Sequence, residues 1–274
     1  MGGTIAFLVA LIVNFGALTY LAISSNTPAL PHLFDQQLIV LAVWGVIVPT
    51  ILGFNARWLS FFAGFRKPDN GRLLAAYGLS ITAVAAVFLE WWAVSAAILL
   101  LAALLAADAL HVWESAAQPA KLLNVHTSFP LFVRIPYVWL VISCVLNALA
   151  VFYDRAGGIW VASRHAITVG FIAGMVFVIG QRILPAFCGM RILWSTRLML
   201  WSVLLLHVGC TLRVTLEPLA YENYWKFAWS LLPCSAMIEL AAVTVFAWNL
   251  IATLLQPPAH LRPIAIQSSR GAAQ

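Results

Sequence analysis

Two histidines of this sequence lie in or beside long apolar runs, where a polar side chain is costly and by default marks a functional site. His207 lies inside residues 192–212, and His165 directly precedes residues 166–187. A single histidine in such a run is more often a hydrogen-bonded packing residue than a ligand. Two of them on adjacent helices favour a haem or metal site, because haem iron is commonly held by axial histidine. His165 and His207 are therefore the candidate metal ligands and cofactor-binding residues.

Glu239 is a carboxylic acid deep in an apolar run, about twelve residues into residues 227–255 and one turn after Ser235. An unpaired carboxylate at that depth is expected to be protonated, because burial disfavours the charged form. Its functional interpretation is a proton relay or a partner for a cofactor. Its structural interpretation is a neutral acid that is hydrogen-bonded between helices. Both interpretations remain open from the sequence.

A cytoplasmic-side polar cluster, defined as Asp108, His111 and Arg134, is predicted where several apolar runs end on the same side. Asp108 and His111 are three residues apart and so share one helical face. Arg134 stands at the start of residues 135–153 and most simply extends to the lipid headgroups. For Arg182 we weigh pairing with Asp108, or with an anionic cofactor group, equally with headgroup contact. Arg182 is therefore a further candidate cofactor-binding residue.

The composition decides which class of protein must hold these residues. Of the 274 residues 63% are hydrophobic and 9% are charged, and the mean hydropathy is +0.96. A soluble domain is nearer half apolar and about a quarter charged, so a water-soluble enzyme is excluded and a lipid bilayer is the expected surrounding. The net charge of +6 is not gathered into a basic stripe, so we expect no nucleic-acid partner. No glycine-rich phosphate loop, C-x-x-C or H-E-x-x-H motif occurs in the sequence.

Eight runs are apolar enough to cross a bilayer, which takes about 20 mainly apolar residues. Glu90, followed by two tryptophans, divides an apolar stretch that is too long for one span and predicts a tight hairpin there. The first run has neither a positive residue before it nor a small-residue cleavage site after it, so we interpret it as a helix and not as a signal peptide. The predicted spans are residues 5–24, 38–54, 73–89, 93–112, 135–153, 166–187, 192–212 and 227–255.

The predicted fold is all-α, a polytopic bundle of eight transmembrane helices in two four-helix repeats. The pattern P-x3-G-x4-W begins at Pro49 and again at Pro185, an offset of 136 residues that carries the second span onto the sixth. Proline and glycine also stop ordinary helices, which is the alternative explanation. The repeat would divide the chain into units at residues 1–128 and 129–256, followed by a short flexible cytoplasmic tail at residues 257–274.

Positive charge predicts the orientation of the spans. With the N-terminus inside, the inner segments hold nine lysines and arginines and the outer loops hold four, so both termini are predicted to be cytoplasmic. In this arrangement His165 lies at the outer surface, whereas His207 lies about 8 Å below the outer end of its span. We therefore expect one of these two histidines, rather than both, to bind a single iron.

Residues 165–175, with the sequence H-A-I-T-V-G-F-I-A-G-M and running on to Arg182, resemble the H-A-L-T-V-G-x-x-x-x-M…R segment near the C-terminus of NnrS-family membrane proteins. Residues 137–140 are similar to that family's Y-x-W-L, and residues 44–57 to its G-x-x-I-P-x-F-T segment. That family is similar to the haem-copper oxidase core in having twelve helices. The resemblance implies a bacterial inner-membrane protein that binds haem, and copper as a further metal, and that is linked to denitrification and nitric oxide stress.

The sequence departs from the family pattern in two ways. The family's L-G-H-T-G is P-A-F-C-G here, at residues 185–189, so the second histidine of that segment is missing. The family's four N-terminal helices, with their W-H-A-H-E-M motif, have no counterpart. The resemblance therefore carries metal ligation over to His165 alone, and a second membrane subunit would have to replace the missing helices.

Three functions remain open from the sequence. The first is a haem- or metal-binding component of nitric oxide or respiratory redox metabolism, which would make the protein a membrane redox protein. The second is a proton-coupled carrier built on a repeat, with Glu239 as its coupling carboxylate. The third is a membrane anchor or assembly factor with no catalytic role.

Overall fold

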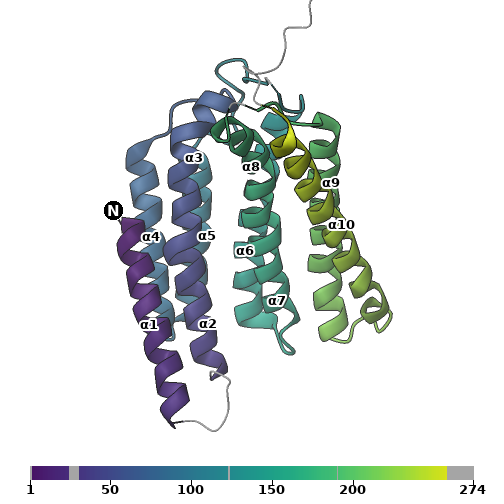
Figure 1. The fold of residues 1–274 in the computed structure, drawn as a ribbon. Coiled ribbons are helices and arrows are strands. Elements are labelled where there is room, and N and C mark those ends of the chain that lie inside the picture. Colours follow the sequence, from purple (N-terminus) through teal and green to yellow (C-terminus); the bar gives the residue numbers. More distant parts are fainter. Residues whose placement is uncertain (1, 25–30, 123, 190, 258–274) are drawn as a thin grey trace, which may run out of the picture.

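The protein, described here from a computed structural model, is an all-helical bundle (Figure 1). The structure describes residues 2–24, 31–122, 124–189 and 191–257, and no strand occurs among them. The prediction of an all-α fold is therefore confirmed. In chain order the elements are α1 (Gly2–Ser24), α2 (His32–Val40), the π-helix η1 (Leu41–Ile47), α3 (Val48–Phe62), α4 (Asn70–Phe88), α5 (Trp92–Ala109), α6 (Phe129–Tyr153), α7 (Gly158–His165), the π-helix η2 (Ala166–Ala173), α8 (Gly174–Phe187), α9 (Thr196–Tyr221) and α10 (Ala228–Leu255).

Seven helices within the described residues are long and apolar enough to cross a bilayer. Two of them are composite helices with 30-residue spans: Leu33–Phe62 lies within α2, η1 and α3, and Gly158–Phe187 is made of α7, η2 and α8. In α1 the stretch Phe7–Ile23 is a shorter apolar helix. A multi-pass membrane protein is thus confirmed, and the eighth span stays a prediction. The predicted tail lies outside the described residues, except for Pro257.

The sixth and seventh predicted spans belong to helices that are longer than hydropathy predicts, and both helices extend past charged residues. The sixth predicted span begins at Gly158 and not at 166, so His165 is the eighth residue of its helix. The seventh continues beyond 212 to Tyr221 and so includes Arg213 and Glu217. Hydropathy falls at a charged residue, but the helix continues where such charges pair with one another. The charged residues that the prediction placed in loops therefore lie inside the bundle.

The 136-residue repeat is not confirmed, because its two prolines lie at different places in their helices. Pro49 is the second residue of α3, whereas Pro185 is the third residue from the end of α8. The bounds of the two composite helices recur at a shorter interval. α2 begins at 32 and α7 at 158, which is 126 residues later, and α3 ends at 62 and α8 at 187, which is 125 residues later. Each composite helix also contains a π-helical segment, a feature that is frequent at functional sites.

The hairpin predicted at Glu90 is confirmed. α4 ends at Phe88 and α5 begins at Trp92, with Glu90 between them at a φ of 61°. The Asp69 side chain caps the beginning of α4, since its Oδ1 accepts hydrogen bonds from the backbone N–H groups of the second and third residues of that helix.

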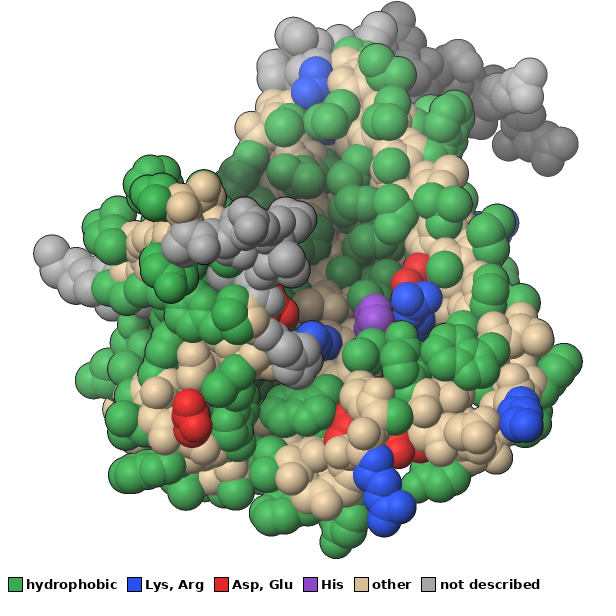
Figure 2. Space-filling view, turned by 90° about the horizontal axis from the view of Figure 1, so that it is seen from below, with side chains coloured by type: hydrophobic (Ala, Val, Ile, Leu, Met, Phe, Trp, Pro, Cys, Tyr) green, Lys and Arg blue, Asp and Glu red, His purple; other side chains and the backbone are tan. Residues whose placement is uncertain are grey.

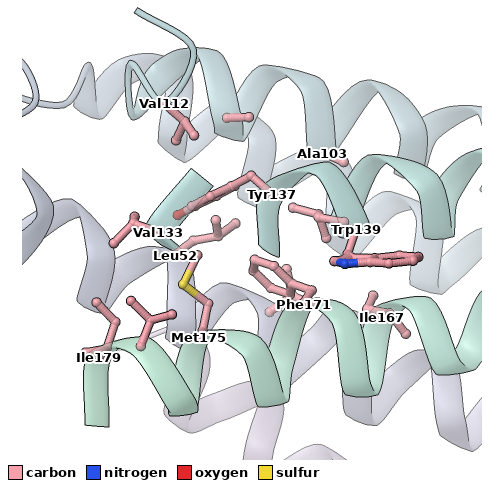
Figure 3. Packing of buried hydrophobic residues seen from close by; sticks show 14 of the residues in the cluster. Leu52, Ala103, Val112, Val133, Tyr137, Trp139, Ile167, Phe171, Met175 and Ile179 are labelled. Carbon is pink, nitrogen blue, oxygen red and sulfur yellow. The ribbon is translucent and has the colours of Figure 1, made fainter. Parts of the chain in front are cut away.

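Close packing fixes the second composite helix against α6. A Cβ atom on Gly170 would lie 2.7 Å from the Cβ atom of Trp139, so only glycine allows this approach. Tyr137, Phe171 and Met175 are buried around the contact, and Figure 3 shows them together with Trp139. This packing holds η2 in place, and η2 begins directly after the last residue of α7.

Candidate functional site

His165, Glu217 and Arg213 form a hydrogen-bonded group near the end of the bundle where α9 joins α10, and we call these three residues the histidine–carboxylate group. Nδ1 of His165 lies 2.9 Å from Oε2 of Glu217, and Nε of Arg213 lies 3.0 Å from Oε1 of the same residue. The Glu217 side chain is 3% exposed, and those of His165 and Arg213 are 26% and 28% exposed. The carboxylate is thus buried beneath two side chains that can each donate to it, which is the condition for keeping a charge away from water.

A glycine brings α7 close enough to α9 to form this group. A Cβ atom on Gly158 would lie 3.1 Å from the carbonyl oxygen of Glu217, so the beginning of α7 touches α9 directly. Arg213 and Glu217 are four residues apart and share one face of α9. His165, at the end of α7, reaches the same face, and its Nδ1 also lies 3.2 Å from the carbonyl oxygen of Val161, one turn back.

The hydrogen bonds of His165 determine which of its ring nitrogens is available. Nδ1 faces the carbonyl oxygen of Val161 and the Glu217 carboxylate whose other oxygen accepts from Arg213, so we assign the proton to Nδ1. The lone pair is then on Nε2. A histidine whose N–H is held by a carboxylate is the usual arrangement for a metal ligand. Figure 2, which views the bundle from this end, shows a histidine next to basic and acidic side chains in the hollow of the face.

His207 is arranged in the opposite way. Nε1 of Trp139 donates a hydrogen bond to its Nδ1 at 3.1 Å, so the neutral ring carries its proton on Nε2. Nε2 is buried and has no hydrogen-bond partner among the described residues. A protonated Nε2 has no lone pair to give to a metal. His207 therefore fits a packing residue of α9 and not a ligand.

The structure does not bring His165 and His207 together. The His207 ring lies against Gly174, where a Cβ atom would be 3.1 Å from Cε1 of the imidazole. Gly174 follows His165 by nine residues, which is about 13 Å along a helix. The two rings are thus more than two helical turns apart in depth.

Glu239 lies where α10 packs most closely on α9. A Cβ atom on Gly209 would lie 2.6 Å from Cγ of Glu239 and 3.2 Å from the carbonyl oxygen of Ser235. Oε1 of Glu239 is buried and has no hydrogen-bond partner within the described part of the chain. The three residues of the histidine–carboxylate group are its electrostatic neighbours. The hydrogen bond between helices that the sequence allowed is not formed by this oxygen.

A family model described as "NnrS protein" matches residues 3–257. This chain belongs to the NnrS protein family. No curated protein and no solved structure matches it significantly. In this NnrS-family protein, residues 165–175 cover the last residue of α7, all of η2 and the start of α8. The segment on which the family resemblance rests therefore begins at His165, within the histidine–carboxylate group.

At the other end of the NnrS-family bundle, the structure divides the predicted cytoplasmic-side polar cluster. Asp108 forms an ion pair with Arg72, with 2.6 Å between Oδ2 and Nη1. His111 lies in the turn after α5 and not at the end of that helix, and its Nδ1 is 2.7 Å from Oε1 of Glu114. Arg134 donates from Nη2 to the carbonyl oxygen of Glu114 at 2.6 Å. His111 and Arg134 thus share a partner, and Asp108 has a different one.

Two further arginines, Arg66 and Arg182, lie at that end of the molecule. Arg66 lies 3.2 Å from Oε2 of Glu114. The hydrogen bond from His111, together with the contact with Arg66, holds the pKa of the Glu114 carboxyl below its ordinary value of 4.5. The guanidinium of Arg182 lies 5.0 Å from the ring centre of Phe62, a cation–π contact, while Asp108 is paired with a different arginine.

Sequence reasoning missed Glu217 and Arg213, because the predicted seventh span ended at 212. A signal for them was nevertheless present. The two residues are spaced four apart, and no glycine or proline interrupts the chain between the predicted end and Glu217. A basic and an acidic residue at that spacing pair on the surface of a continuing helix.

Proposed function

We propose that this protein is a haem-binding membrane component of nitric oxide or respiratory redox metabolism, in which His165 supplies an axial imidazole. The observation that carries the proposal is the 2.9 Å contact between Nδ1 of His165 and the buried carboxylate of Glu217. The contact fixes the ring and leaves Nε2 for iron. The link to nitric oxide comes from the resemblance to the family, to which the chain belongs over nearly its whole length.

The available side chains suit a haem better than a free copper ion. The porphyrin itself gives iron four nitrogen ligands, so one protein imidazole is enough to hold it. Among the described residues no group of three or more His, Cys, Asp or Glu side chains could hold a metal ion, so copper would need ligands from elsewhere. His207 does not fit as a second ligand, because its Nδ1 accepts a hydrogen bond from Trp139. Arg182 lies over Phe62, near the opposite end of its helix from His165.

A bound haem would supply electron transfer or a binding position for a diatomic gas. The residues of the chain have separate roles around it. Glu217 accepts the Nδ1–H of His165, which orients the ring and makes Nε2 a better electron donor. Arg213 donates a hydrogen bond to the other oxygen of Glu217 and holds the side chain in place.

The test compares the haem content of two variants that each lose one imidazole. His165→Ala should lose its haem, and His207→Ala should keep the haem-to-protein ratio of the parent. Glu217→Gln should retain haem but shift its reduction potential, because the imidazole loses a charged acceptor. A His165→Ala protein that folds and keeps the parent's haem would overturn the assignment.

A proton-coupled carrier is the second candidate, and a separate observation favours it. A buried carboxyl oxygen without a hydrogen-bond partner at Glu239 is a place where a proton could bind and leave. If the protein is a proton-coupled carrier, Glu239→Gln should abolish proton-coupled uptake into vesicles while the haem content stays unchanged. If Glu239→Gln and Glu239→Leu both leave transport and stability untouched, the carrier function is wrong.

The location in the bacterial inner membrane, with both termini cytoplasmic, belongs to the same proposal. So does a second membrane subunit that packs against this bundle. α10 is the span with the smallest buried share, 17%, which leaves most of its apolar face for lipid or for such a subunit. An anchor or assembly factor without catalysis would be built in the same way, but it would bind no haem.

A further inference from the structure

Arg164, the residue before His165, lines two cavities whose linings include no residue of the histidine–carboxylate group. The larger cavity has a volume of about 430 Å³ and the smaller one about 40 Å³. Three residues line both cavities: Gln36 from α2, and Trp160 and Arg164 from α7. The two cavities therefore meet at the guanidinium-bearing face of α7.

The Arg164 guanidinium has no partner in the part of the chain that the structure describes. It forms no hydrogen bond and no ion pair within 4 Å, although it is half-buried, whereas Arg72 and Arg213 are both paired with carboxylates. Asp35 on α2 interacts with it electrostatically from beyond ion-pair distance. A half-buried cation that no described side chain pairs with is a candidate binding group for an anionic ligand.

Asp154, the acidic residue that lines the larger cavity, already has hydrogen-bond partners. The carboxylate of Asp154 accepts hydrogen bonds from the backbone N–H groups of Gly157 and Trp160, both at 2.7 Å. It thereby joins α6 to the beginning of α7. Its oxygens are directed to the backbone, so Arg164 remains the charged group available to a ligand in this cavity.

The depth of Arg164 in the membrane indicates where the anion comes from. The helix Gly158–Phe187 has 30 residues, about 45 Å, which matches a bilayer including its headgroups. Arg164 is the seventh residue of that helix and so lies at the level of the headgroups. Trp92 and Trp160 line the larger cavity and meet edge to face, 5.8 Å between ring centres, as expected of aromatic residues at the interface.

We propose that this cavity binds a membrane phospholipid, with the headgroup phosphate on Arg164. Arginine pairs with phosphate through two parallel N–H donors. The apolar side of the same cavity, formed by Leu33, Ala150 and Val151, accepts the beginning of an acyl chain. A phospholipid contacts both the guanidinium and the apolar side of the cavity, whereas a soluble phosphate contacts the guanidinium alone.

The test measures lipid affinity on the purified full chain after delipidation in detergent. The probes are dioleoyl phosphatidylglycerol, dioleoylglycerol, which lacks the phosphate, and glycerol phosphate, which lacks the acyl chains. Binding is followed by native mass spectrometry and by the rise in Tm. Arg164→Gln is compared with Arg155→Gln, because Arg155 is an exposed arginine near the same end of the bundle that lines neither cavity.

The parent and Arg155→Gln should bind phosphatidylglycerol with the same affinity. Arg164→Gln should bind it about tenfold or more weakly. Arg164→Lys keeps the charge without the two parallel donors, so its affinity for phosphatidylglycerol should lie between that of the parent and that of Arg164→Gln. Equal binding of dioleoylglycerol, equal protection by glycerol phosphate, or unchanged binding in Arg164→Gln would each overturn the proposal. If Arg164→Gln does not fold, the Arg164→Lys comparison decides: affinity equal to that of the parent contradicts a phosphate held by arginine. Haem content should be the same in all these variants, so the lipid site and the haem proposal can fail separately.

Discussion

Glu217 is the residue on which the candidate site depends, because it is a buried acid that contacts two basic side chains at once. The sequence indicated His165 through its position and its family resemblance. It could not indicate what the imidazole contacts, because that depends on how α7 packs on α9. Only the packing at Gly158 brings a carboxylate from 52 residues further along the chain to Nδ1.

Glu217→Gln should therefore destabilise the protein even when no cofactor is bound. Losing the charge leaves Arg213 and His165 without their buried partner, at a cost of about 3 kcal/mol. A double-variant comparison with Arg213→Gln, followed by thermal unfolding in detergent, checks this result. Because the two residues touch, the double variant should lose less than the sum of the single losses. Strictly additive losses would show that the pair does not interact.

At the opposite end of the bundle, the contacts of Glu114 lead us to expect that acid weakens the structure of the chain after α5. Its pKa is lowered in the folded protein, mainly by the hydrogen bond from His111. The stabilisation is therefore fully present above pH 4.5 and is lost as the pH falls through the lowered folded value. Over that range the protection of the Ala117 and Gln118 amides, which donate to the carbonyl oxygen of Gly64, should fall when their hydrogen-exchange rates are compared with those of an unstructured peptide at the same pH.

Glu114→Gln is the matched variant for this effect. It should show lower protection of those amides already at pH 7, with little further loss of protection on acidification. Glu90→Gln, an exposed change at a different turn, should behave as the parent does. Protection that depends on pH equally in the parent and in Glu114→Gln would assign the effect to another group.

At the scale of the elements, hydropathy predicted most spanning helices and the hairpin at Glu90, because apolar length alone determines whether a helix can cross a bilayer. It misjudged the ends of the sixth and seventh spans, since charged residues that pair between helices look like loop residues in a sequence. The π-helical segments and the spacing of 125 to 126 residues between the composite helices were also missed. The proline, glycine and tryptophan pattern indicated a different offset, which the helix bounds do not follow.

The packing of α6 on η2 gives a prediction at the same scale. Gly170→Ala should destabilise the protein by about 1–3 kcal/mol, because the added methyl group meets the Trp139 side chain. Gly53→Ala is the control, since nothing lies within 4 Å of a Cβ atom there and alanine favours helix. Thermal unfolding of both variants in the same detergent tests the difference. A Gly170→Ala protein as stable as Gly53→Ala would contradict the close packing.

For the molecule as a whole, the alternation of its helices predicts a definite topology. The connections after α3 and after α8 lie on one side of the membrane, and the connection between α9 and α10 lies on the other (Figure 1). Reporter fusions at Lys67 and Arg191 should therefore read cytoplasmic, and a fusion at Glu222 should read periplasmic. A periplasmic signal at Lys67 would reverse the orientation and would place the histidine–carboxylate group on the cytoplasmic side.

The central claim is that one histidine, held by a buried carboxylate, gives this bundle a haem ligand. The most direct test is the visible absorption spectrum of the unmodified protein, purified from cells with ample haem and recorded oxidised, reduced, and reduced with nitric oxide. We expect about one haem per chain, with absorption bands that shift on reduction and shift again when nitric oxide is added. A purified, folded protein without haem absorption would contradict the claim and would leave the carrier and the assembly factor as the remaining functions.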